Sequence, residues 1–189
     1  MKKYLFAFYS IIILFCKTYS QSGFNIAIQK ENNRTSSNII EHQGNLYFVD
    51  METVSGYSTR LNFYSYSADG NLRFVKSLMF GSLVTATKIL KTKDDKIALF
   101  AYGMQCHVGT PFRNYLIKLD TNGSTLNTKT FTVSSTSNFL LDVCQLADSN
   151  YYFISNYKIF KLPGNGILTQ STASFDSLAY IIPYDSTRF

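Results

Sequence analysis

Apolar and polar residues alternate along most of the chain, and the alternation returns in a fixed layout. Three stretches, which begin at Leu61, Asn114 and Asn156, each hold an alternating run, a turn with glycine and a second alternating run. A period of two residues is typical of β-strands with one buried face. The turns contain dipeptides that accept the positive φ angles of tight hairpins: Asp69 with Gly70, Asn122 with Gly123, and Asn165 with Gly166. The pattern therefore predicts three β-hairpins.

A second kind of hairpin is predicted between these. It begins with an apolar strand, at Asn38, Thr87 and Asp142, and continues through a polar turn into a strongly apolar strand. The turns are centred near Gly44, Asp95 and Ser149. The second strands, LYFV, IALFA and YYFI, are apolar on both faces. Strands of this kind are buried on both sides, so we expect sheets that pack face to face.

The two kinds of hairpin follow one another in order, so that one unit holds four strands and spans roughly 40–55 residues, as in the blade of a β-propeller. We therefore predict an all-β, β-propeller-like fold of about three and a half four-stranded antiparallel blades. A lead-in at 21–35 precedes blades at about 36–80, 81–133 and 134–173, and a fourth begins at 174–189. No helix is expected outside the first twenty residues.

One unit carries a recognisable motif. The stretch NYLIKLDTNGSTLNTKTF, at 114–131, resembles the KLDxNG repeat of exported β-propeller proteins of Bacteroidetes, which are often cargo of type IX secretion. Lys118, Leu119, Asp120, Asn122 and Gly123 match that repeat. An asparagine, at position 127, stands where the family often has tryptophan. The resemblance extends over about 38–189 and implies a fold and an exported location, but no chemistry.

The predicted number of blades is too small for a closed ring, since propellers usually have 4–8 blades. Open sheet edges invite association. We expect the chain to be the N-terminal fragment of a longer reading frame, in which case the resemblance implies a C-terminal sorting module further on. Self-association through the open edges and a small stacked β-sandwich are the alternatives.

The first twenty residues have the layout of a secretory signal peptide. Lys2 and Lys3 precede an apolar run over 4–16, and a short polar stretch leads to a predicted cleavage between Ser20 and Gln21. The run is shorter than the ~20 apolar residues of a membrane-spanning helix. We therefore expect a secreted or outer-surface protein with no transmembrane segment in the mature chain. Lipidation at Cys16 is disfavoured, because a bulky residue, Phe15, precedes it.

Removal of this segment changes the charge argument. It lowers the formal net charge from +6 to +3, because Lys2, Lys3 and Lys17 leave with it. The remaining basic residues are scattered rather than arranged in a stripe, so nucleic acid is not an expected partner. A protein or a glycan at the cell surface is the expected class of ligand.

Few residues are candidates for chemistry. The connector at 102–113 is longer than its counterparts, and such loops are where binding residues concentrate, so Cys106, His107 and Arg113 form a candidate ligand loop. Adjacent side chains of an extended chain point to opposite sides, so Cys106 and His107 suit neither a metal site nor a nucleophile pair. Cys106 and Cys144 could form a disulfide in an exported protein, or remain two buried thiols. His42 is expected at the surface.

The carboxylates are expected to have structural roles. Asp94, Asp95 and Asp148 are predicted in turns, and they could form a glycosidase pair only if the fold brought them together. The DTNGS stretch at 120–124 has alternating oxygen donors, but it lacks the glutamate of a calcium loop, so a hairpin turn is expected. No catalytic residue, metal or cofactor is assigned.

These observations favour an exported, non-catalytic β-propeller repeat protein for surface binding, adhesion or scaffolding. The alternative is a glycan-active enzyme, a lyase or a hydrolase, built on a propeller.

Overall fold

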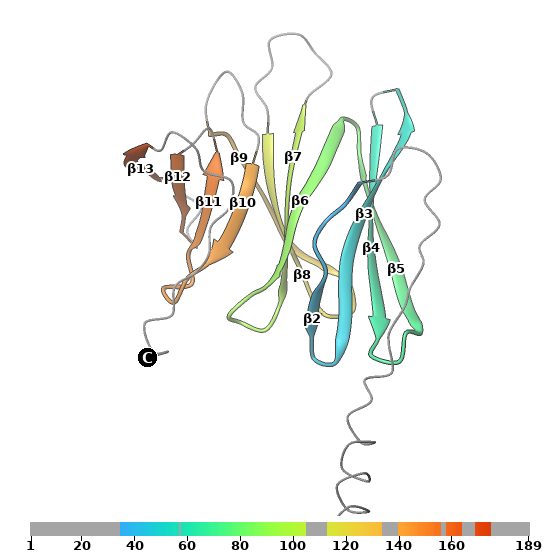
Figure 1. The fold of residues 1–189 in the computed structure, drawn as a ribbon. Helices are drawn as coiled ribbons and strands as arrows, with labels where there is room; N and C mark the ends of the chain where they lie inside the picture. The colour runs from blue at the N-terminus through green and yellow to red at the C-terminus, as the bar shows by residue number, and fades with distance from the viewer. Residues whose placement is uncertain are drawn as a thin grey trace, which may run out of the picture.

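The computed structural model describes residues 35–56, 58–104, 113–133, 140–155, 158–163 and 169–174. Within these ranges the chain consists of β-strands joined by turns and short connectors, with no helix, so the all-β prediction is confirmed. The strands form three antiparallel sheets that stand side by side (Figure 1). The predicted signal peptide with its cleavage at Ser20 and Gln21, and most of the lead-in, lie outside the described residues, as do positions 175–189.

The first sheet has five strands, in the order β1-β3-β4-β5, with β2 also paired to β3. Their bounds are β1 Thr35–Ser36, β2 Ile40–His42, β3 Asn45–Ser55, β4 Ser58–Ser67 and β5 Leu72–Phe80. Because β4 pairs with β3 along its length, β1 and β2 share the other edge of β3 and act as one interrupted strand. At the interruption, the Ser37 hydroxyl accepts a hydrogen bond from the Val49 amide at 3.0 Å.

The second and third sheets each have four strands in chain order. The second contains β6 Leu83–Lys91, β7 Ile97–Met104, β8 Arg113–Leu119 and β9 Thr125–Phe131. The third contains β10 Leu140–Gln145, β11 Tyr151–Ser155, β12 Lys158–Leu162 and β13 Thr169–Ser174. All neighbouring strands are antiparallel, so each sheet is a simple meander. The sheets occupy 35–80, 83–131 and 140–174, against predicted units at 36–80, 81–133 and 134–173.

The core lies on both faces of the second sheet. Strand β7 is fully buried from Ile97 to Ala101, with 0% exposure at each residue. One side of the strand, including Leu99, packs with Phe63 and other residues of the first sheet. The other side, including Phe100, packs with Phe153 and other residues of the third sheet. The prediction that the IALFA strand is buried on both faces is confirmed, and the reason is that a neighbouring sheet covers each face.

The first strands of the three sheets lie close together. Strand β6 contacts β1, β2, β3 and β4 of the first sheet, and β10 contacts β6 and β7. The side-chain amide of Asn38 fixes one of these junctions. Its Nδ2 donates to the carbonyl of Ile89 at 2.8 Å, and its Oδ1 accepts from the Ile89 amide at 2.8 Å. An asparagine side chain thus takes the place of a strand residue between the first and second sheets.

Four of the hairpin loops share one backbone pattern. In each, the first residue's N–H bonds the carbonyl of the fifth, and the fourth residue's N–H bonds the carbonyl of the first. The fourth residue has positive φ, as in three-residue hairpin loops with a bulge. It is glycine in the predicted turns at Gly70 and Gly123, with φ of 85° and 79°. In the other two it is Asp95 and Ser149.

The remaining predicted turns divide into two groups. The turn at Gly44 has only two loop residues, and both Gln43 and Gly44 have positive φ, at 52° and 69°. The turn predicted at Asn165 and Gly166 lies outside the described residues. At the predicted dipeptides Asp69-Gly70 and Asn122-Gly123, only the glycines have positive φ, because the loops are longer than two residues.

The outermost strands expose apolar side chains. Leu72 and Met79 on β5 are 53% and 58% exposed, and Leu126 on β9 is 50% exposed. Exposed strand edges can pair with another chain. Self-association through these edges stays a prediction.

Candidate functional site

A cleft of about 290 Å³ lies between the second and third sheets, beside the β6–β7 and β10–β11 loops. We call it the lysine cleft. The second sheet and its β6–β7 loop contribute Lys93, Asp94, Leu116, Lys118, Asn127 and Lys129. The third sheet and its β10–β11 loop contribute Gln145, Ser149 and Tyr151.

Strand pairing places four of these side chains on one face. In the register of β8 and β9, Leu116 lies opposite Lys129 and Lys118 lies opposite Asn127. Residues two apart on a strand share a face, so all four point the same way. Leu116 belongs to the core cluster shared with the third sheet. The two lysines therefore face the third sheet, where the hydrophobic core gives way to the cleft.

The opposite wall carries neutral hydrogen-bonding groups on a rigid base. The Tyr151 ring packs edge-to-face on Phe100, with ring centroids 5.3 Å apart, and Tyr151 is only 8% exposed. Burial, with a smaller contribution from the negative charge of Asp94, raises the pKa of Tyr151 to about 12. The Gln145 side chain joins the two loops, because Oε1 accepts from the Lys93 amide at 2.8 Å and Nε2 donates to the Ser149 carbonyl at 2.9 Å.

The carboxylate in the cleft is tied to one of its lysines. Asp94 forms an ion pair with Lys118. Partial burial would raise the pKa of Asp94, but hydrogen bonds from Lys118 and Thr92 outweigh it and hold the pKa below its usual value. Asp94 therefore stays ionised at neutral pH. With Lys93, Lys118 and Lys129 present, the charge of the cleft remains positive.

The KLDTNG stretch explains how Lys118 is held. Leu119, 1% exposed, anchors the end of β8 in the core. The next residue, Asp120, accepts hydrogen bonds at Oδ1 from the amides of Asn122 at 2.9 Å and Ser124 at 2.7 Å. Gly123 supplies the positive φ. The motif builds a hairpin loop, as predicted, and within the part of the chain that the structure describes no three His, Cys, Asp or Glu residues group as metal ligands.

Replacing Asp120 by alanine is expected to destabilise the fold by about 1–3 kcal/mol, because two loop amides lose a charged acceptor. Asp120→Asn keeps one acceptor oxygen and should cost less than half as much. Asp69→Ala, in the corresponding loop of the first sheet, is the control, since Asp69 is exposed and does not cap its loop. Urea unfolding midpoints measure all three. Equal losses for Asp120→Ala and Asp69→Ala would contradict the capping role.

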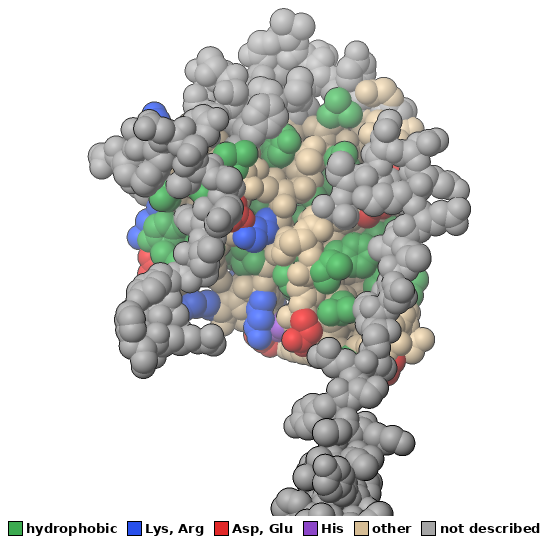
Figure 2. Space-filling model, in the orientation of Figure 1, with side chains coloured by type: hydrophobic (Ala, Val, Ile, Leu, Met, Phe, Trp, Pro, Cys, Tyr) green, Lys and Arg blue, Asp and Glu red, His purple; other side chains and the backbone are tan. Residues whose placement is uncertain are grey.

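A second groove, of about 420 Å³, adjoins the lysine cleft and runs between β6 and β10. The two share Lys93 and Gln145. Figure 2 shows Lys and Arg side chains on this side of the molecule. Lys88 pairs with Asp142 across the groove at 2.5 Å. Cys144, which also lines it, has a free thiol that is 7% exposed, and burial raises its pKa. Cys144 is therefore a buried thiol in this structure, and its disulfide with Cys106 stays a prediction, because Cys106 lies outside the described residues.

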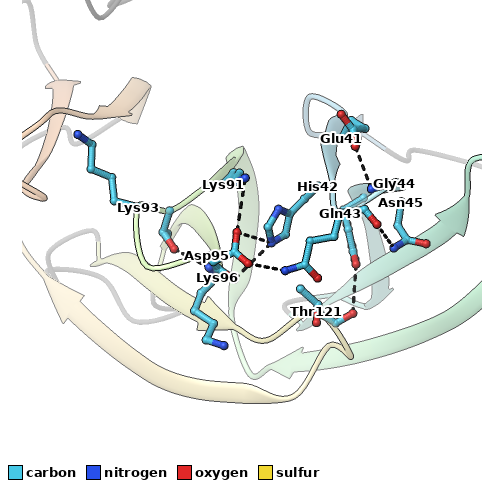
Figure 3. A network of polar contacts seen from close by, with 12 residues as sticks. Glu41, His42, Gln43, Gly44, Asn45, Lys91, Lys93, Asp95, Lys96 and Thr121 are labelled. Atoms are coloured by element: carbon cyan, nitrogen blue, oxygen red, sulfur yellow. Dashed lines mark hydrogen bonds and ion pairs between the residues drawn. The ribbon is translucent and has the colours of Figure 1, made fainter.

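His42 is at the centre of a polar network between the first two sheets (Figure 3). Its side chain is 0% exposed, so the expectation of a surface histidine is wrong. Nε2 lies 3.3 Å from the Asp95 carbonyl oxygen and 3.7 Å from Oδ1 of its carboxylate. Gln43 donates to the same carboxylate, and Lys91 lies 3.5 Å from it. His42 is buried because the β6–β7 loop lies against the end of β2, a contact between residues far apart in the sequence.

The three turn carboxylates have separate partners. Asp94 pairs with Lys118, and Asp95 is held by Gln43, whose hydrogen bond is the main cause of its lowered pKa. Asp148 accepts from Asn150 Nδ2 at 2.6 Å and from the Tyr152 hydroxyl at 2.8 Å. All three lie in turns, as predicted. These contacts give the three carboxylates structural roles in their turns.

The hydrogen bonds of Asp148 predict that the stability of the fold depends on pH. Hydrogen bonds from Asn150, then Tyr152 and Lys161, hold the pKa of Asp148 well below its usual 3.8. A carboxyl group with a depressed folded-state pKa stabilises the fold above its unfolded-state value, and the contribution disappears as the pH falls through the folded value. Asp148→Asn should therefore lower the urea midpoint at pH 6, and the difference from the wild type should shrink steadily below pH ~4. A difference independent of pH would contradict this linkage.

The candidate ligand loop is only partly described. Cys106 and His107 lie outside the described residues. Arg113 begins β8, opposite Gly103, and is exposed. The lysine cleft was not predicted from the sequence. In the sequence, Lys118 belongs to the KLDxNG motif, and Asn127 and Lys129 are two residues apart, the spacing of one strand face.

The described residues define an all-β protein of three packed antiparallel sheets. No family model matches the chain, and no curated protein matches it. Its fold is similar to the crystal structure of a protein of unknown function from Bacteroides caccae, with a TM-score of 0.55 and 11% identity. The match covers 76% of this chain and 48% of that protein, and at this identity it concerns the fold alone. Among the described residues, no helix is long and apolar enough to cross a membrane.

Proposed function

We propose that the chain forms blades of an exported β-propeller that binds a surface ligand without transforming it. Three consecutive antiparallel sheets of five, four and four strands, packed face to face and with β6 in contact with the first strands of the other two, support the propeller arrangement. The signal-like segment at 1–20 supports export. Cargo status in type IX secretion is part of the same proposal and rests on the KLDxNG resemblance.

The lining of the lysine cleft carries the proposal of binding over catalysis. Glycoside hydrolysis uses two carboxyl groups that flank the scissile bond. The described residues of the cleft present one, Asp94, and its ion pair with Lys118 keeps it ionised and therefore a poor proton donor. A lyase needs a base with a pKa near the working pH. The phenol of Tyr151, with a pKa of about 12, is poorly suited to that role.

A glycan panel tests this function. The purified protein is incubated with acidic and neutral polysaccharides, and both retention on the glycan and formation of new reducing ends or unsaturated products are measured. Retention without product is expected for the wild type. Asp94→Asn should also give no product, and it should retain ligand at least as well, because it removes the negative charge of the cleft. Turnover by the wild type that Asp94→Asn abolishes would disprove the non-catalytic function.

The propeller arrangement has its own test. Electron-microscopy class averages of the protein expressed from its complete reading frame are expected to show a ring with a central channel. A two-layered sandwich without a channel would contradict it.

A further inference from the structure

The charge balance of the lysine cleft points to an anionic ligand. Among the described residues that line it, three lysines lie on the side of the second sheet, and one carboxylate, Asp94, stands against them. Asp94 is already engaged by Lys118. Lys93 and Lys129 add two further ammonium groups to the described lining of the same small volume. A site with this excess of positive charge between low-dielectric walls concentrates anions.

Lys93 is placed to meet such a ligand. It is exposed at the mouth of the cleft, and its ammonium has no ion-pair or hydrogen-bond partner among the residues described. Its backbone is nevertheless fixed, because the Lys93 amide donates to Gln145 at 2.8 Å. The side chain is therefore attached to a defined point between the two sheets while its charged end is available.

The remaining lining suits a polyhydroxylated ligand rather than a bare inorganic ion. Asn127, Gln145 and Ser149 offer amide and hydroxyl groups, and Leu116 and Tyr151 form an apolar base. A sugar ring has both hydroxyl groups and apolar C–H faces, which match these two kinds of surface. The volume of about 290 Å³ is at the lower end for ligand pockets, which typically hold ~300–1,000 Å³. It therefore suits one or two sugar residues.

We propose that the lysine cleft binds an anionic sugar residue of an acidic polysaccharide, with its carboxylate or sulfate between Lys93 and Lys129. The sugar hydroxyls would meet Asn127 and Gln145. This assignment deepens the proposed binding function and rests on it. A nucleic acid is the weaker candidate, because it requires basic side chains spaced along a groove that follows the backbone, whereas these lysines converge on one cleft.

The test measures dissociation constants by calorimetry at low salt for the purified protein and three variants. The probes are polygalacturonate for carboxylates, chondroitin sulfate for sulfates, dextran as a neutral glycan and single-stranded oligothymidylate. Lys93→Gln and Lys129→Gln each remove one ammonium from the cleft. Lys76→Gln is the matched control, because Lys76 is exposed on β5 of the first sheet. Unfolding midpoints check that each variant is folded. If Lys129→Gln does not fold, Lys93→Gln alone tests the site.

Binding of at least one acidic glycan, but not of dextran, is expected, with the affinity reduced about tenfold by each cleft variant and less than twofold by Lys76→Gln. The stronger of the two acidic probes identifies carboxylate or sulfate as the recognised group. Affinities within twofold of the wild type in both cleft variants would overturn the site while leaving the binding function intact. No acidic glycan bound, or tighter oligothymidylate binding that the same variants abolish, would overturn the ligand class. Turnover of a bound glycan would contradict only the non-catalytic function.

Discussion

Replacing Phe100 by alanine is expected to destabilise the protein by about 3–5 kcal/mol, the range for large aromatic side chains in a packed core. Phe100 has 0% exposure and packs with Tyr151 and Phe153 in the cluster between the second and third sheets. Its loss leaves a cavity at the base of the lysine cleft. The free energy of unfolding from urea titration measures the effect.

The neighbouring residue makes this prediction specific to the architecture. Leu99 also has 0% exposure, but it belongs to the cluster between the first and second sheets. Leu99→Ala should cost about 2–5 kcal/mol. Leu126→Ala, on the 50% exposed side chain of β9, is the control and should change stability by less than ~1 kcal/mol. If only one of the two adjacent core substitutions were costly, the second sheet would be covered on one face alone, and the packing described here would be wrong.

The strands and their burial could be predicted from the sequence because they depend on local pattern. The IALFA segment is apolar at successive positions, and a strand with two covered faces is the arrangement that buries all of them. The hairpin loops were also predictable, since glycine, aspartate and asparagine tolerate positive φ better than most residues. In the loops at Asp95 and Ser149, the residue with positive φ is not glycine, and the turns were predicted there from their polar residues.

The candidate site could not be predicted, because it depends on which sheets pack together and in what register. Lys118 and Lys129 are separated along the chain, and only the pairing of β8 with β9 puts them on one face. Gln145 and Lys93 meet only because the third sheet packs on the second. The buried position of His42 has the same origin, since Asp95 of another sheet lies against it. Long-range contacts of this kind leave no periodic signal in the sequence.

Replacing Gly123 by alanine should destabilise the fold by about 2–4 kcal/mol. Its φ of 79° is unfavourable for residues with a side chain. A Cβ atom there would also lie 2.7 Å from Phe74 Cε2 and 2.8 Å from Lys76 Cγ. Both contacts are too short, and Phe74 packs against the core of the first sheet. Unfolding free energies of the wild type and variant give the comparison.

Gly44 separates the two causes. It also has positive φ, 69°, but a Cβ atom there would meet nothing within 4 Å, so Gly44→Ala should cost only ~1–2 kcal/mol for the backbone conformation. The excess at Gly123 measures the contact of the β8–β9 loop with the first sheet, which the hydrogen bond from the Tyr47 hydroxyl to the Thr121 carbonyl, 3.2 Å long, also fixes. Equal costs at both glycines would mean that this loop does not pack on the first sheet. A larger cost at Gly123 means that the glycine of the KLDTNG stretch is required for packing between sheets as well as for the turn.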